Sequence, residues 1–169
     1  MKLHVFSIVI ALIIALVGAL PVLPVSLAAI GTAKGTLTYK NKVVALKCAY
    51  LVMGPDAIDT KKIIRRLILA ATDVGAKIRA CQTMSCVDGA LTEGMTVEFH
   101  GGPRVNVWMA IDDGRVQYSG TESPTAFNAS TDEPKRLAGG LSFDATSKGG
   151  PRVDAEFDAA PLKELKAAR

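Results

Sequence analysis

The chain has 169 residues, of which 49% are hydrophobic and 21% charged, with a formal net charge of +4. Its basic residues are scattered among acidic ones, and only 5% of the residues are aromatic. A nucleic-acid-binding surface gathers basic side chains and interleaves aromatic rings for stacking. The composition therefore argues against a nucleic-acid partner and is typical of a folded domain with a solvated surface.

The first 28 residues have the three parts of a secretory signal peptide. Lys2 is the basic start, residues 5–20 form an uncharged apolar run, and Ser26-Leu27-Ala28 offers small residues at the −3 and −1 positions. We predict cleavage after Ala28, with Gly31 as the alternative, and export to the periplasm or the medium. An uncleaved anchor is disfavoured, because the run is shorter than the ~20 residues that span a bilayer.

Residues 29–169 are predicted to form a single antiparallel β domain. Residues 36–40 and 43–53 flank Asn41 as an opening hairpin. The second of these strands is predicted to be central, since both of its faces are largely apolar. One face is predicted to hold Val44, Leu46, Cys48, Tyr50 and Val52.

The next segment, 62–72, fits either a buried strand or a helix, and its β-branched residues favour a strand. Residues 73–81 are the one segment predicted to be helical, for about two turns, with Thr72 or Asp73 as its N-cap. The helix would therefore be a small addition to a β domain.

Apolar and polar residues alternate cleanly after Gly94. The strands 96–100 and 104–111 lead to Asp112-Asp113-Gly114, a strong hairpin signal, after which Val116 and Tyr118 continue the buried pattern. A last hairpin pairs 137–143 with 153–157. Residues 120–134 are predicted to be the longest connection.

About eight strands joined by short hairpins predict a mainly β fold with an antiparallel sheet and one short helix. A barrel-like domain and a two-sheet sandwich both fit this pattern. We favour the barrel-like form, because closing a sheet removes its exposed edges.

Three cysteines remain after the signal. In an oxidising compartment Cys81 and Cys86 are the natural disulfide pair, closing a small loop. Cys48 is then unpaired in an apolar strand, where a free cysteine behaves as a small hydrophobe. A redox or nucleophilic role is disfavoured, because nothing nearby supplies an electropositive, partly exposed thiol. A zinc site is disfavoured, because Cys81 and Cys86 have a better use together.

Two segments carry a family resemblance. Residues 35–46 with Ala49-Tyr50 and Gly54-Pro55-Asp56, and Pro151-Arg152-Val153-Asp154-Ala155-Glu156-Phe157-Asp158-Ala159 near the end, resemble small exported bacterial β-sheet proteins of uncharacterised function. The resemblance implies an exported bacterial β protein and no functional residues.

No catalytic, cofactor or metal site is predicted. His100 is the sole histidine after the signal, and the Gly-x-Ser-x-Gly elbow of a serine hydrolase is absent from the sequence. Asp154, Glu156 and Asp158 alternate along one strand face. Such carboxylates can hold a hard cation, but a solvated acidic face is the favoured interpretation.

Trp108, Tyr118 and His100 are the candidate ligand or contact residues. Trp108 falls on the face opposite Val107 and Met109, so it marks either a contact patch or a ring packed under the predicted helix. Packing is the favoured interpretation.

The leading hypothesis is an exported, non-enzymatic binding or interaction module for an unknown small molecule or envelope protein, with a carrier of a small apolar ligand as one version. The alternatives are a small exported hydrolase that uses His100 and a structural component of the envelope. No membrane span is expected once the signal is removed.

Overall fold

The computed structural model describes residues 31–99, 105–112 and 115–169. The predicted signal peptide and His100 lie outside these residues. The strands are β1 (Gly31–Tyr39), β2 (Lys42–Pro55), β3 (Ile63–Ala70), β4 (Gly94–Phe99), β5 (Val105–Ile111), β6 (Arg115–Glu122), β7 (Phe127–Glu133), β8 (Arg136–Asp144), β9 (Arg152–Ala159) and β10 (Pro161–Glu164). The helices are α1 (Gly75–Ala80) and α2 (Met84–Ala90), with 3₁₀ turns η1 (Pro124–Ala126) and η2 (Thr146–Lys148).

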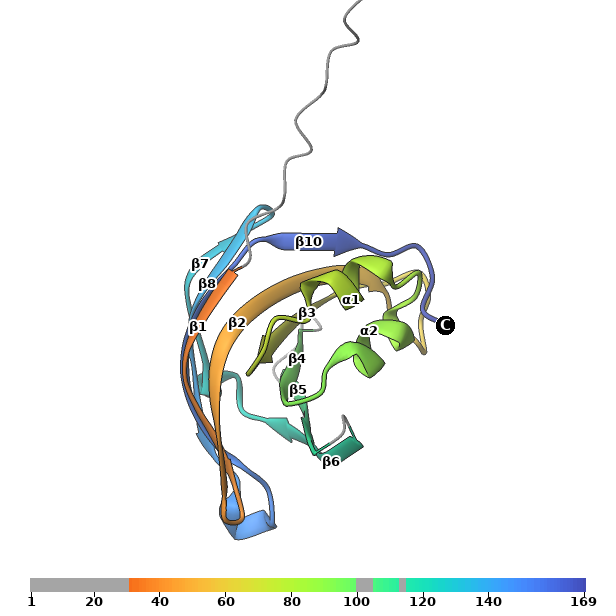
Figure 1. Ribbon diagram of the computed structural model, residues 1–169. Coiled ribbons are helices and arrows are strands. Elements are labelled where there is room, and N and C mark those ends of the chain that lie inside the picture. Colours follow the sequence, from red (N-terminus) through yellow and green to blue (C-terminus); the bar gives the residue numbers. More distant parts are fainter. Residues whose placement is uncertain (1–30, 100–104, 113–114) are drawn as a thin grey trace, which may run out of the picture.

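Nine of these strands follow one another through the sheet in the order β6-β5-β4-β3-β2-β1-β9-β8-β7, each antiparallel to its neighbours. The sheet curls into a half-barrel, so that β1, β7, β8 and β9 face β3, β4, β5 and β6 (Figure 1). The prediction of a mainly β, antiparallel, barrel-like domain is confirmed. Among the described strands β6 and β7 do not pair with each other, so the sheet stays open and these two are its edge strands.

The sheet bends at β2. The first part of this strand pairs with β1, and the part from Cys48 onward pairs with β3. The register shifts between the pair Thr32–Cys48 and the pair Gly35–Leu46. β1 has two residues between these pairs and β2 has one, which is a β-bulge. Gly35 has a φ of +153°, and a Cβ there would lie 2.2 Å from a backbone carbonyl oxygen, so the bend requires glycine.

This bulge overturns one prediction about β2. Val44 and Leu46 both face the inner core, as predicted. The next side chains of β2 that face inward are Ala49 and Leu51. Cys48, Tyr50 and Val52 belong to the opposite, outer face. Strict alternation placed all five apolar residues on one face, and it failed because the register shifts at the bend.

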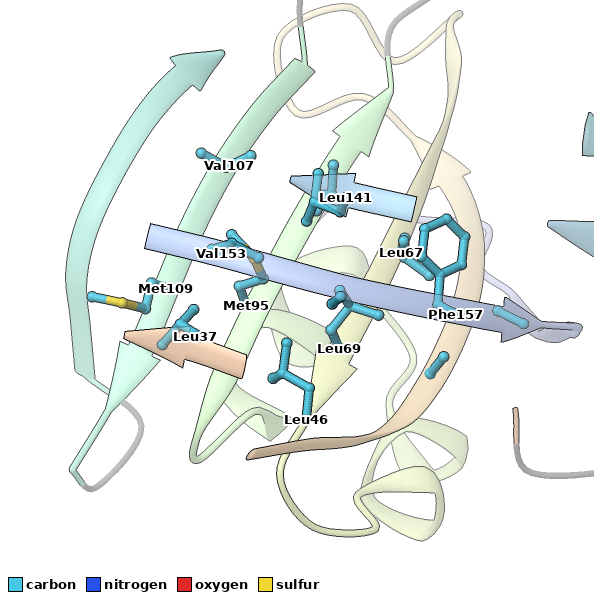
Figure 2. Packing of buried hydrophobic residues seen from close by; sticks show 14 of the residues in the cluster. Leu37, Leu46, Leu67, Leu69, Met95, Val107, Met109, Leu141, Val153 and Phe157 are labelled. Atoms are coloured by element: carbon cyan, nitrogen blue, oxygen red, sulfur yellow. The ribbon is translucent and has the colours of Figure 1, made fainter. Parts of the chain in front are cut away.

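The inner core lies between the two halves of the curled sheet. Figure 2 shows β9 crossing over the strands of the opposite half, with side chains from both halves meeting between them. Leu37, Leu69 and Met95 are completely buried there. The ring of Phe127 lies 4.4 Å from that of Phe99 and 5.6 Å from that of Phe157, measured between centroids. These aromatic contacts join the two halves near β7.

A second apolar cluster lies on the outer face of β2 and β3, where α1 and α2 cover it (Figure 1). Ile78 of α1 and Met84 and Val87 of α2 pack against Tyr50 and Ile68 of the sheet. β10 extends this cover and pairs with β2 in the parallel direction, which departs from the predicted purely antiparallel pairing.

Three elements depart from the sequence expectations. The predicted helix 73–81 is α1, and a second helix that was not predicted, α2, follows it after the Cys81 turn. The predicted connection 120–134 contains η1 and the strand β7. β7 was not predicted, because it lies exposed at the sheet edge and most of its residues are polar. The opening, Asp112 and final hairpins pair as predicted. Val116, which was predicted to be buried with Tyr118, is instead exposed, because the register between β5 and β6 shifts there.

Candidate functional site

The inner face of the half-barrel is filled by side chains. Nineteen buried residues from both halves form the inner cluster, and none of them is more than 5% exposed. Leu67, Met109 and Leu141 project into this space from different strands (Figure 2). Because the inner face is filled, the candidate binding surfaces among the described residues are the outer faces of the sheet.

Trp108 and Tyr118 lie on opposite faces of the sheet. Tyr118 packs against the inner cluster and donates a hydrogen bond to a Glu122 carboxylate oxygen at 3.2 Å. Trp108 is half-buried on the outer face, beside Thr96 on β4 and Ser119 on β6. The structure thus separates these two candidate contact residues, and the third, His100, lies outside the described residues. A hydrolase based on His100 stays a prediction.

A buried charge cluster surrounds Trp108 on this outer face. The Arg66 guanidinium lies 4.9 Å from the centre of the Trp108 ring. Its Nε donates to Glu98 Oε2 at 2.7 Å, and its Nη1 donates to Asp88 Oδ1 at 2.8 Å and to the Met84 carbonyl oxygen at 3.3 Å. Arg66 therefore connects β3, β4, β5 and α2 through one side chain.

This cluster is suited to holding α2 rather than to proton transfer. The Arg66 side chain is 8% exposed, and arginine remains charged at physiological pH. Burial raises the pKa of the Asp88 carboxyl, and the adjacent Arg66 opposes that rise. The sequence contained the charges, but it could not show that strand register and α2 bring them together.

Tyr50 and Asp73 form a second polar group, beneath the start of α1. The Tyr50 hydroxyl donates to Asp73 Oδ1 at 2.6 Å and accepts the Val74 N–H at 3.1 Å. Burial and then the Asp73 contact raise the pKa of Tyr50, and the hydroxyl holds the pKa of Asp73 below its usual value. Cys48 is a free, half-buried thiol beside them, packed against the outer cluster as a small apolar side chain.

Cys81 and Cys86 form a disulfide, as predicted. It joins the end of α1 to α2, and the C-terminal segment packs beside it: Ala167 accepts the Met84 N–H at 3.0 Å, and Lys163 Nζ donates to the carbonyl oxygens of Arg79 and Cys81. The bond is therefore one of several connections within the cover of the outer face.

Replacing both cysteines by serine is expected to lower the free energy of unfolding by about 2 kcal/mol without loss of the fold, because the closed loop is short. Urea unfolding with and without reductant measures this effect. A Cys48→Ser variant is the control and should retain the wild-type response to reductant. A stability change of the same size in Cys48→Ser but not in the double variant would contradict the assigned pairing.

Within residues 31–99, 105–112 and 115–169, no element covers the outer face of the other half of the sheet in this way. We call this surface, formed by the outward side chains of β1, β9, β8 and β7, the bare face. The outer apolar cluster beneath α1, α2 and β10 contains none of its residues. Its outward positions are polar or small: Thr32, Lys34, Thr36, Thr38, Asp154, Glu156, Asp158, Gly140, Ser142, Asn128 and Ser130.

A hollow of about 480 Å³ lies on the bare face over Gly139 and Gly140. Asn128 and Ser130 line it from β7, and Glu156 and Asp158 line it from β9. Ser130 Oγ donates to the Ala138 carbonyl oxygen at 3.2 Å, which leaves the hydroxyl able to accept another bond. Ala138 and Phe157 complete the lining, so the hollow offers amide, hydroxyl and carboxylate groups around a floor that includes two glycines.

The acidic residues of this face differ in their partners. Asp158 receives two hydrogen bonds from Arg136, at 2.9 Å and 2.7 Å, and that contact holds the pKa of its carboxyl below the usual value. Asp154 and Glu156 are exposed, as expected for a solvated acidic face. Among the described residues, no group of three or more histidine, cysteine or acidic side chains is placed to hold a metal ion.

Comparison with protein-family models, with curated proteins and with solved structures finds no match to this chain. The resemblance to small exported bacterial β proteins therefore stays a prediction. No helix within the described ranges is long and apolar enough to cross a membrane.

Proposed function

We propose that the chain is an exported, non-enzymatic interaction module that binds a hydrogen-bonding partner on the bare face. The observation that supports this most directly is the contrast between the two outer faces of the sheet. One is covered by α1, α2 and β10, and the other is left uncovered by the described residues and carries the hollow over Gly139 and Gly140. The filled inner face favours this version over a carrier of an apolar ligand.

The lining of the hollow indicates the chemistry of the partner. Asn128 can both donate and accept, while Ser130 and Glu156 offer oxygen acceptors. A partner that presents hydroxyl or ammonium groups matches this set, since such groups donate to carboxylate and amide oxygens. The surface is polar and open, which suits a partner that remains partly in water.

Filling the hollow tests this proposal. Gly140 has open space around it, because a Cβ there would meet its nearest atom only at 3.9 Å. Gly140→Tyr should therefore occupy the hollow without disturbing the backbone. Ser142→Tyr is the matched control, being outward on β8 one position further along the same face.

We expect the domain to bind at least one member of a panel of soluble glycans and polyamines, detected by chemical-shift changes at residues 128–130, 138–140 and 156–158. Gly140→Tyr should abolish that binding, and Ser142→Tyr should retain it. Binding that survives in Gly140→Tyr would exclude the hollow as its site. Thermal stabilisation by a lipid instead, without shifts on the bare face, would favour the carrier.

A further inference from the structure

Residues 161–169 cross the covered outer face as a segment that we call the C-terminal strap. β10 and the C-terminus run beside α1 and α2 (Figure 1). Leu165 and Ala168 of the strap are buried. Gly54 of β2 lies directly against Met84 of α2 and Leu165, because an added Cβ there would come within 2.6 Å and 3.2 Å of them. The strap therefore completes the outer apolar cluster between α2 and β2.

Outside β2, the strap is hydrogen-bonded to residues 79–86, the corner between α1 and α2. Lys163 Nζ donates to the carbonyl oxygens of Arg79 and Cys81, at the end of α1. Carbonyl oxygens of the strap accept bonds from the start of α2: Met84 N–H donates to Ala167, and Ser85 N–H and Oγ donate to Ala168, each at 3.0 Å. The strap thus needs the end of α1 and the start of α2 to stay at a fixed spacing.

The Cys81–Cys86 disulfide maintains that spacing, since it joins the end of α1 to α2. The two helices contain six and seven residues, and helices this short depend on tertiary contacts for their stability. α2 is also held from β3, because Arg66 Nη1 donates to its Met84 carbonyl oxygen and to its Asp88 carboxylate. Loss of the disulfide should therefore free the end of α1 and the strap before it frees α2.

One sulfur of the disulfide is open to attack in the folded chain. Cys86 is exposed, whereas Cys81 is buried in the outer cluster. A thiolate of a dithiol donor attacks Cys86 Sγ, the S–S bond breaks, and Cys81 leaves as a thiolate that takes up a proton. The second thiol of the donor then attacks the mixed disulfide, which releases Cys86 as a thiol and the donor as its own disulfide. Two electrons and two protons thus pass from the donor to the cysteine pair.

We propose that the disulfide is a redox-sensitive switch: its reduction by a dithiol donor opens the C-terminal strap while the half-barrel stays folded. The two cysteines are the target of the exchange and not its catalyst. Opening removes β10 from its pairing with residues 51–53 of β2 and uncovers the apolar side chains beneath Leu165. The switch lies on the covered face, so it does not depend on the function proposed for the bare face.

Hydrogen–deuterium exchange of the full chain tests the proposal, read by mass spectrometry before and after treatment with dithiothreitol in the absence of denaturant. We expect exchange at residues 163–169 to become faster by about tenfold or more on reduction, with little change in β8 and β9. Reoxidation should restore the slow exchange. Cys48→Ser should respond as the wild type does, and the double variant Cys81→Ser/Cys86→Ser should exchange fast at 163–169 with or without reductant.

Unchanged exchange at 163–169 after complete reduction would overturn the proposal. An equal rise throughout β8 and β9 would do so too, because the disulfide would then constrain the whole domain. A disulfide that resists dithiothreitol until denaturant is added would exclude a switch in the folded chain. Lys163→Met gives an independent measurement, because it removes the bonds to the end of α1 and should speed exchange at 165–169 in the oxidised chain. Lys61→Met, at an exposed lysine elsewhere, is its control; equal exchange in the two variants would contradict the proposal.

Discussion

Replacing Arg66 with alanine is expected to lower the free energy of unfolding by about 3–5 kcal/mol, because the change removes the cation that the buried Glu98 and the half-buried Asp88 share. For a domain of this size the loss corresponds to a fall in melting temperature of roughly 10–20 °C. Differential scanning calorimetry or urea unfolding followed by circular dichroism measures it. The Trp108 fluorescence should change as well, since Arg66 lies over its ring.

Arg136→Ala is the matched control for this prediction. Arg136 also binds a carboxylate through two hydrogen bonds, but both partners of that pair are exposed to solvent. Exposed ion pairs contribute little to stability, so its melting temperature should hardly change. The double variant Arg66→Met/Glu98→Met should be less destabilised than the sum of its single changes. Strict additivity would show that the pair is not coupled.

Gly139→Ala is expected to destabilise the domain by about 2–4 kcal/mol, whereas Gly140→Ala should be nearly neutral. Gly139 has a φ of +158°, and a Cβ there would lie 2.1 Å from the Asn128 carbonyl oxygen. It sits where the register between β7 and β8 shifts, so the backbone has no room to move away. At Gly140 the same added atom meets open space.

Equilibrium unfolding of these two variants side by side measures the effect with a control one residue away. Both changes add the same methyl group to the same strand, so intrinsic strand preference cancels between them. Equal stability of the two variants would mean that β7 relaxes away from β8. It would also mean that the bulge does not require glycine.

The mainly β class, the opening and final hairpins and the Cys81–Cys86 pair were predictable, because each depends on residues close together in the chain. The Asn41 and Asp112 turns are local signals, and alternation on β9 correctly placed Val153, Ala155 and Phe157 inward. The same rule failed on β2 beyond Leu46, where the register with β1 shifts and the inward series continues at Ala49 instead of Cys48.

β7 and α2 were missed for a different reason. A strand at the edge of a sheet with both faces near solvent has no apolar alternation to detect, and β7 is polar along most of its length. α2 is a short helix with glycine within it, and such helices are stabilised by tertiary packing rather than by local propensity. Its N-cap, Thr83, accepts the Cys86 N–H at 3.2 Å.

The sequence by itself determined the β class, the local turns and the short disulfide loop, since these follow from side-chain periodicity and neighbouring residues. Tertiary structure alone decided which outer face is covered, where the hollow lies, and that Arg66, Glu98 and Asp88 meet beside Trp108. These features depend on strand register and on how far the sheet curls. Both are set by contacts between residues far apart in the chain, which no local pattern records.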